Sequence, residues 1–228
     1  EAERMRREFT ANVSHELKTP LQSIIGSAEL LENGLVKPED QLRFLSRIHQ
    51  EADRLVALIN DILRLSQLDE GGALPHEQVS VLELAQEAAR SLTEQAAAQA
   101  VHISVTGTAG TVFGVRRLLY EIARNLCENA VKYNVPGGSV TVEVAETDRD
   151  VTLLVRDTGI GIPEGDQSRV FERFYRVDKS HSRAIGGTGL GLSIVKHAVA
   201  YHHGTLRLES QPGKGTVITV TLPKKPTE

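Results

Sequence analysis

The chain has 228 residues, a formal net charge of −4, and 40% hydrophobic and 25% charged residues. This balance is typical of a soluble globular protein of two modest domains, and the absence of a basic stripe argues against a nucleic-acid partner. No apolar run approaches the roughly 20 residues of a membrane span. The one cysteine, Cys127, excludes an internal disulfide and favours a reducing, cytoplasmic location.

Residues 1–68 have the pattern of a helical hairpin. Apolar residues recur at helical spacing from Phe9 to Leu31 and again from Leu42 to Leu65. The segment "NGLVKPED" (33–40) interrupts the pattern with a glycine and a proline. Two antiparallel helices cannot enclose a core, so we expect two copies to form a dimeric four-helix bundle.

Residues 69–80, "DEGGALPHEQVS", are predicted to be a linker, after which the pattern changes. Helices are expected over about 81–100 and 116–133, with another from Gly189. Strands are expected in "VHISVTG", "SVTVEVAE", "VTLLVRD", "TLRLES" and "TVITVTL". Residues 81–228 are therefore predicted to form an α+β sandwich, with an antiparallel or mixed sheet covered on one face by helices.

His15 and Pro20 are unusual features of the first helix. At about 100° per residue, His15 falls almost opposite the apolar stripe, and Thr19 lies one turn later on the same outer face. Pro20 cannot donate a hydrogen bond to the carbonyl of Glu16, so we predict a bend there. Taken alone, the His15–Glu16 pair is typical of a solvated helix surface.

A second polar group lies in "NLCENAVKY" (125–133). Spacings of four, seven and eight place Asn125, Asn129, Lys132 and Tyr133 on one stripe of a helix. Two amides, an ammonium and an aromatic ring at the edge of a cleft can hold a metal, phosphates and a base. Amide oxygens suit Mg²⁺, which keeps water and phosphate oxygens as its other ligands. A solvated helix face is the alternative.

The segment "VTLLVRDTGIGIP" (151–163) ends an apolar strand face with Asp157. A carboxylate in that position needs a partner, and the amino group of adenine is a suitable donor. Gly159 and Gly161 permit close approach of the backbone. The alternative is that Asp157 caps a turn.

A glycine-rich helix start follows in "GGTGLGLSIVKH" (186–197). Unpaired N–H groups and the helix dipole favour phosphate there, so the candidate residues are Gly187, Thr188, Gly189, Leu190 and Gly191. The segment is not a P-loop, because no Gly-Lys-Ser/Thr follows, and no strand precedes it as in a dinucleotide fingerprint. Three separate elements thus indicate one nucleotide.

Together these motifs resemble those of bacterial sensor histidine kinases. "FTANVSHELKTPL" resembles the H box, "NLCENAVKY" the N box, "DTGIGIP" the first glycine box, "FERFYRVD" (171–178) the F box and "GGTGLGL" the second glycine box. All five occur in the family order and cover nearly the whole chain. The resemblance implies a dimerisation and histidine-phosphotransfer hairpin (1–68), then a catalytic ATP-binding domain (81–228) of the gyrase, chaperone and histidine kinase type.

The resemblance also implies a role for each matching residue. His15 is the implied phosphoacceptor, Glu16 its general base, and Thr19 the residue that assists dephosphorylation of the partner. ATP and Mg²⁺ are the implied cofactors. Asn129 is the implied metal ligand, and Asn125 is implied to support the phosphates and the metal. Lys132 and Arg176 are implied to contact phosphate oxygens. Tyr133 is implied to pack near the adenine, and Asp157 to accept a hydrogen bond from the adenine amino group. Residues from about Glu164 to Thr188 are implied to form the ATP lid.

The implied activity is that of an ATP-dependent protein-histidine kinase, which autophosphorylates His15, passes the phosphoryl group to an aspartate of a response regulator and assists the regulator's dephosphorylation. The implied partners are a second copy of the chain and the regulator's receiver domain. We expect the sequence to be the cytoplasmic fragment of a protein that is anchored in a membrane upstream, without membrane contact of its own. A dimeric ATPase and a nucleotide-binding scaffold of the same fold are the alternatives. The ATPase needs a glutamate base where Asn125 stands, and Glu128 is predicted to point off the ligand stripe.

Overall fold

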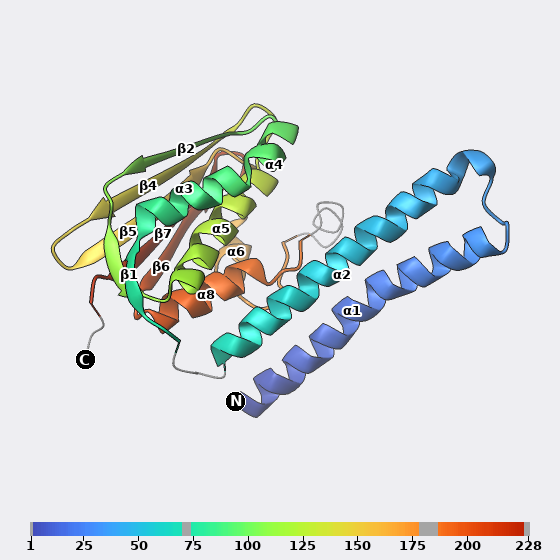
Figure 1. The fold of residues 1–228 in the computed structure, drawn as a ribbon, viewed down its shortest axis with the longest axis horizontal. Coiled ribbons are helices and arrows are strands. Elements are labelled where there is room, and N and C mark those ends of the chain that lie inside the picture. The colour runs from blue at the N-terminus through green and yellow to red at the C-terminus, as the bar shows by residue number, and fades with distance from the viewer. Residues whose placement is uncertain (1, 70–73, 178–186, 226–228) are drawn as a thin grey trace.

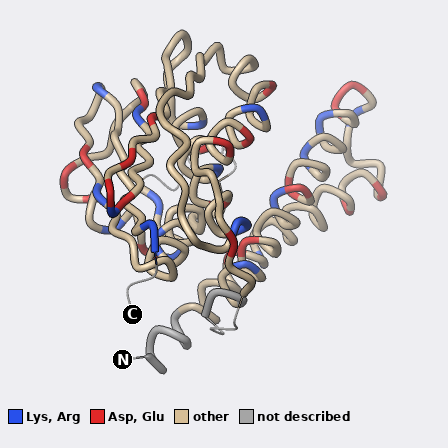
Figure 2. Tube along the Cα trace, turned by 60° about the vertical axis from the view of Figure 1, so that its left-hand side comes forward, with Lys and Arg blue, Asp and Glu red and all other residues tan. Residues whose placement is uncertain are grey.

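The structure, a computed structural model, describes residues 2–69, 74–177 and 187–225, with the side chains of 2–8 and 67–69 left undescribed. A long helical hairpin lies beside an α/β domain, and the second helix of the hairpin is the one nearer that domain (Figure 1). Lys and Arg are interspersed with Asp and Glu on both parts (Figure 2). The two-domain organisation predicted from the sequence is therefore confirmed.

The hairpin consists of α1 (Ala2–Glu32) and α2 (Gln41–Asp69), joined through a short 3₁₀ helix, η1 (Pro38–Asp40). Helix α1 continues through Pro20, whose side chain is buried. Large apolar side chains of the single copy remain exposed on both helices: Leu21, Ile25, Leu30, Leu42, Leu45, Val56, Ile59 and Leu63. This much exposed apolar surface fits the expected pairing of two copies. None of the helices in the described ranges is both long and apolar enough to cross a bilayer.

The α/β domain contains a five-stranded sheet with the order β2-β4-β5-β7-β6. The strands are β2 (His102–Gly107), β4 (Ser139–Glu146), β5 (Asp150–Asp157), β6 (Thr205–Gln211) and β7 (Gly215–Pro223). Only β2 and β4 run parallel, and the other three neighbouring pairs are antiparallel. The sheet is thus mixed, one of the two forms predicted, and β7 lies inside it although it is the last strand described.

Helices cover one face of this sheet (Figure 1). They are α3 (Val81–Ser91), α5 (Arg116–Lys132) and α8 (Gly191–Tyr201). The core forms between the two layers, where alternate strand residues such as Val142, Leu153 and Val220 are buried with Ile122 and Val195 of the helices. This arrangement confirms the α+β sandwich.

Three details differ from the sequence-based expectation. A two-stranded antiparallel sheet, formed by β1 (Glu77–Ser80) and β3 (Thr111–Gly114), was not predicted, and β1 lies within the segment expected to be a linker. The expected helix over 81–100 is divided into α3 and α4 (Thr93–Ala98). The hydroxyls of Ser91 and Thr93 donate to carbonyls one turn earlier, at Ala88 and Arg90, which competes with regular helix bonding at this point. Residues 163–188, whose charged sequence predicts irregular structure, include one helical turn, α6 (Glu164–Gln167).

The hairpin and the α/β domain share an apolar contact. Leu58 and Leu65 of α2 are buried together with Leu190 and Ile194 at the start of α8, and we call these four residues the interdomain cluster. Phe9 and Phe174 pack against it, with ring centroids 5.8 Å apart. The start of α8, a predicted phosphate-binding element, is therefore held against α2.

Candidate functional site

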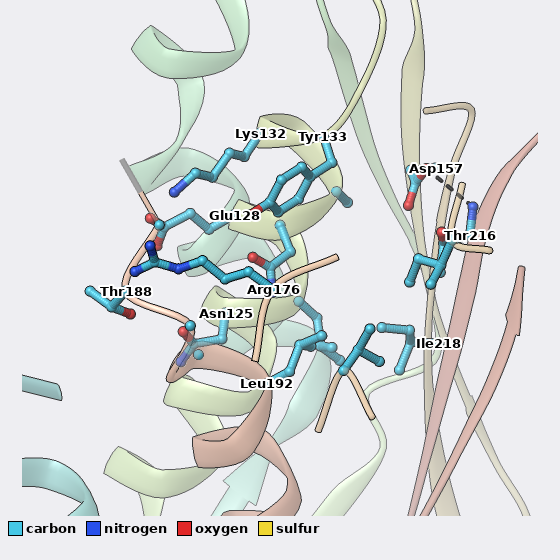
Figure 3. A pocket seen from close by; sticks show the side chains of 18 of the residues that line it. Asn125, Glu128, Lys132, Tyr133, Asp157, Arg176, Thr188, Leu192, Thr216 and Ile218 are labelled. Atoms are coloured by element: carbon cyan, nitrogen blue, oxygen red, sulfur yellow. Dashed lines mark hydrogen bonds between the residues drawn. The ribbon is translucent and has the colours of Figure 1, made fainter. Parts of the chain in front are cut away.

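A cavity of about 580 Å³ lies between α5, β5, the start of α8 and helix α2. It brings together most of the predicted nucleotide-binding residues: Asn125, Asn129, Lys132, Tyr133, Asp157, Gly161, Arg176, Gly187, Thr188, Gly189 and Gly191. Asp157 and Thr216 lie at one end, while Lys132, Arg176 and Thr188 lie at the other (Figure 3). The cavity thus has the Asp157 carboxylate at one end, and at the other end cationic and hydroxyl donors together with the carboxylate of Glu128.

Helix α5 provides the polar floor of the cavity. The amide nitrogen of Asn125 donates to the carbonyl oxygen of Glu121, 2.8 Å away, and this bond fixes the orientation of the amide. Its oxygen lies where a side chain on Gly191 would collide with it, since a Cβ there would be 2.8 Å from Oδ1. Burial lowers the pKa of Lys132, although Glu128 acts in the opposite direction. A half-buried ammonium facing a cavity is suited to binding an anion.

Asp157 occupies the other end of the cavity. Its Oδ1 accepts hydrogen bonds from the backbone N–H groups of Gly159 and Thr216, at 2.8 and 3.2 Å. Burial raises the pKa of Asp157, and these two hydrogen bonds oppose the rise. Because both bonds use Oδ1, Oδ2 is the oxygen left for a ligand. Tyr133 and Ile218 also line the cavity, and an aromatic ring and an aliphatic chain suit a flat base (Figure 3).

The two glycines after Asp157 are required by close backbone contacts. Gly161 has φ +69°, and a Cβ there would collide with the carbonyl oxygen of Gln211. A Cβ at Gly159 would collide with the carbonyl oxygen of Tyr133. Gly161 lines the cavity, whereas Gly159 does not and instead orients the carboxylate.

Some residues of the glycine-rich segment line the cavity, and others contact the hairpin. Thr188 lines the cavity and donates its hydroxyl to Oδ2 of Asp61 in α2, 2.8 Å away. Leu190, predicted to bind the nucleotide, does not line the cavity, because its side chain is fully buried in the interdomain cluster. Residues 178–186 of the expected lid lie outside the described residues, but Arg176, just before them, lines the cavity.

The H-box residues lie beside the cavity rather than in its lining. The His15 side chain is 80% exposed, as predicted, and its Nδ1 is 3.9 Å from Oε1 of Glu16, beyond hydrogen-bond distance. The other carboxylate oxygen, Oε2, accepts a hydrogen bond from Arg176 at 3.2 Å and lies 3.9 Å from Arg54. Thr19 is exposed and donates its hydroxyl to the carbonyl oxygen of His15. Arg176 therefore links the cavity to the residue next to His15.

Sequence reasoning missed several residues of this cavity. Ala57, Asn60, Asp61 and Arg64 of α2 line it, and no motif indicates them. The expectation that Glu128 points off the ligand stripe was wrong, because this side chain also lines the cavity, 3.4 Å from Arg124 (Figure 3). Three residues along a helix amount to about 300°, so Glu128 is displaced only about 60° from Asn125. The cavity is wider than the narrow stripe that we assumed.

Known proteins share both parts of this arrangement. Residues 5–71 match the His Kinase A (phospho-acceptor) domain, and residues 114–226 match the family described as histidine kinase-, DNA gyrase B- and HSP90-like ATPase. A solved structure of the mycobacterial sensor histidine kinase MprB is 33% identical, with a TM-score of 0.58, over 67% of this chain and 100% of that one. The chain belongs to the sensor histidine kinase family.

Other histidine kinases match over almost the whole chain. SenX3 of Mycolicibacterium smegmatis is 42% identical over 98% of this chain and 59% of that protein, and WalK of Bacillus subtilis is 37% identical over 96% and 37%. This histidine kinase chain therefore spans less than two thirds of the length of these relatives. Full-length ShkA, solved in complex with AMPPNP, is 28% identical with a TM-score of 0.69, over 95% of this chain and 45% of that one.

Proposed function

We propose that the chain is an ATP-dependent protein-histidine kinase, which transfers the γ-phosphoryl group of ATP to His15 and then passes it to an aspartate of a response-regulator receiver domain. One observation carries the proposal. Arg176 lines a nucleotide-sized cavity and also donates to Glu16, the neighbour of an exposed histidine, at 3.2 Å. The nucleotide site and the acceptor residue thus lie on facing surfaces of one molecule.

ATP would bind with its adenine at Asp157, whose free oxygen accepts from the exocyclic amino group. Lys132, Arg176 and the start of α8 would then meet the phosphates. The donors at that end are an ammonium, a guanidinium and the Thr188 hydroxyl, the groups that proteins use for phosphate oxygens. The match to an ATPase family and the AMPPNP in the ShkA structure support ATP as the ligand.

Mg²⁺ fits the donors at the phosphate end. Asn129, whose side chain carries an amide oxygen, lines the cavity, and among the residues described there is no group of three or more His, Cys, Asp or Glu side chains that could hold a metal without the nucleotide. A metal at Asn129 would therefore share oxygens with phosphates and water. When bound, it would neutralise part of the phosphate charge.

The transfer step requires little from the protein beyond positioning and charge. A ring nitrogen of His15 forms a bond to the γ-phosphorus, and the bond to the β,γ-bridging oxygen breaks, with its electrons leaving on ADP. Glu16 accepts the ring proton. His15 does not line the cavity of its own chain in the arrangement described, so transfer within one chain requires the α/β domain to shift relative to α1.

The proposed partners are a second copy of the chain and a receiver domain. The exposed apolar residues of α1 and α2 support the first, and the exposed positions of His15 and Thr19 support the second, including Thr19-assisted dephosphorylation. The histidine kinase ThkA, solved in complex with the response regulator TrrA, has the same fold, with a TM-score of 0.77 at 23% identity over 96% of this chain and 62% of that one.

Incubation with γ-labelled ATP and Mg²⁺ tests the proposal. We expect acid-labile, alkali-stable label on the chain, abolished by His15→Gln and by Asn129→Ala at saturating ATP. His49→Gln is the matched control, because His49 is an equally exposed histidine on the other helix of the hairpin (79%). Release of free phosphate without label would instead indicate the ATPase, and neither product would indicate the scaffold. Label that survives His15→Gln would refute the phosphoacceptor assignment.

A further inference from the structure

The hairpin contributes side chains to the cavity from the opposite domain. Asp61 and Arg64 of α2 both line it. Asp61 accepts the hydroxyl of Thr188 at 2.8 Å, and Glu16 of α1 accepts from Arg176 at 3.2 Å. Two carboxylates of the hairpin therefore hold two groups at the end of the cavity where Lys132 also lies (Figure 3).

The surroundings of Asp61 make the ionised form of its carboxyl group unfavourable in free energy. The side chain is only 16% exposed, and burial raises the pKa of its carboxyl group, with the hydrogen bond from Thr188 and the charge of Arg64 opposing the rise. Arg64 lies 3.5 Å from Asp61 but also 3.3 Å from Glu121 of α5, so its charge is shared between two carboxylates. The bond from Thr188 is thus a main compensation for keeping Asp61 ionised at this contact.

A phosphate oxygen and a carboxylate oxygen compete for such a donor. The Thr188 hydroxyl has one proton to donate, so it serves Asp61 or a phosphate but not both. A triphosphate in the cavity would also lie near the Asp61 charge, in surroundings partly shielded from water, where like charges repel more strongly than in bulk solvent.

We propose that Asp61 holds the α/β domain against the hairpin by occupying the Thr188 hydroxyl, so that this docking and the binding of a nucleoside triphosphate oppose each other. The inference rests on the proposed function, because it takes the Thr188 end of the cavity to be the phosphate end. Glu16, which holds Arg176, acts in the same direction. Binding of the triphosphate then frees the α/β domain from a position in which His15 lies outside the cavity.

The opposition has a quantitative consequence. If docking reduces the fraction of chains able to bind the triphosphate, the measured affinity falls by that fraction, and the coupling works equally in both directions. Removing the Asp61 carboxylate should therefore tighten triphosphate binding although it removes a polar group from the cavity. A residue that held the metal would have the opposite effect, and a carboxylate that only repelled the phosphates would tighten binding without changing how the two domains are arranged.

Calorimetric titration of the whole chain with AMPPNP and Mg²⁺ tests this inference. We expect Asp61→Ala to lower the Kd by about tenfold, the size of one net hydrogen bond to a charged group. Asp61→Asn should lower it less, because the amide oxygen still accepts from Thr188. Asp53→Ala is the matched control, since Asp53 is an aspartate on α2 with a 70% exposed side chain, and its Kd should equal that of the wild type. Adenosine, which lacks phosphates, should bind all four chains equally.

An unchanged or higher Kd for AMPPNP in Asp61→Ala would overturn the inference, as would equal tightening for adenosine, because the competition would then not be at the phosphates. Solution scattering of the wild-type chain gives a test that needs no substitution. The profile should change when AMPPNP saturates the chain, and superimposable profiles would overturn the inference. A chain that binds AMPPNP but never labels His15 would contradict the proposed function alone, and a chain that binds neither ligand would contradict both.

Discussion

Replacement of Asp157 by asparagine separates a ligand-binding role from a structural one. In the folded chain Oδ1 accepts from the N–H groups of Gly159 and Thr216, at 2.8 and 3.2 Å. The amide oxygen of an asparagine would take the place of Oδ1, because only an oxygen can accept these two bonds. The amide NH₂ would then occupy the place of Oδ2 and face the adenine amino group, donor against donor. The local turn would be preserved while the ligand contact is lost.

The magnitude follows from the bond that is lost. A hydrogen bond to a charged group contributes about 1.5–3 kcal/mol, so the Kd for ADP should rise by about 10- to 150-fold. Stability should not fall. Burial raises the pKa of Asp157, so the folded state binds the proton more tightly than the unfolded state and its charge weakens folding at pH 7. A neutral amide removes that penalty, and the Tm should equal or exceed that of the wild type.

Calorimetry with ADP and thermal denaturation at pH 7 measure the two quantities. Asp148→Asn, at an exposed turn between β4 and β5, is the control and should change neither. A Kd within about threefold of the wild type, together with a lower Tm, would refute the reasoning. That outcome would favour the alternative in which Asp157 only caps a turn.

Three other predictions concern single residues. Gly161→Ala should lower the Tm clearly, because φ is +69° and a Cβ would collide with the carbonyl oxygen of Gln211. Gly165→Ala is the control and should leave the Tm unchanged, because a Cβ there meets no atom within 4 Å. Equal Tm values for the two variants would contradict the collision at Gly161. Cys127 should not react with iodoacetamide at pH 8 until the chain is unfolded in urea, because burial raises the pKa of its thiol to about 12. Alkylation of Cys127 in the folded chain would contradict this prediction. Burial lowers the pKa of His202, so the unfolded state binds a proton at this residue more readily than the folded state does. The free energy of unfolding should therefore fall as the pH drops from 7 to 5. In urea titrations His202→Gln should make this dependence on pH weaker, and an unchanged dependence would show that His202 is not its source.

Those parts of the site that depend on one helix or one strand could be predicted from the sequence. Asn125, Asn129 and Lys132 share a helix, so their spacing alone places them together, and the phase of β5 places Asp157 at the end of its strand. Asp61 and Arg64 could not be predicted, because they reach the cavity only through the packing of α2 against α8.

The unpredicted features of the fold have a similar origin. Strands β1 and β3 have four residues each and pair across the whole of α3, α4 and β2, so neither shows a pattern long enough to distinguish it from a loop. The second donor to Asp157 is the backbone N–H of Thr216, which carries no side-chain signal. The two-domain division, by contrast, could be predicted, because the spacing of apolar residues is helical in residues 1–68 and alternates between helix and strand patterns after residue 80. This change is visible without any knowledge of tertiary contacts.

The interior position of β7 has a consequence for synthesis on the ribosome. This strand pairs with β5 on one side and β6 on the other, and Lys224, just beyond it, bonds to the backbone of Arg149 and Phe113. Until these final residues have emerged, β5 exposes an unpaired edge of the kind that recruits other strands. The helical hairpin is translated first and has no such dependence. Each nascent chain therefore presents the exposed apolar side chains of α1 and α2 before its own sheet can close.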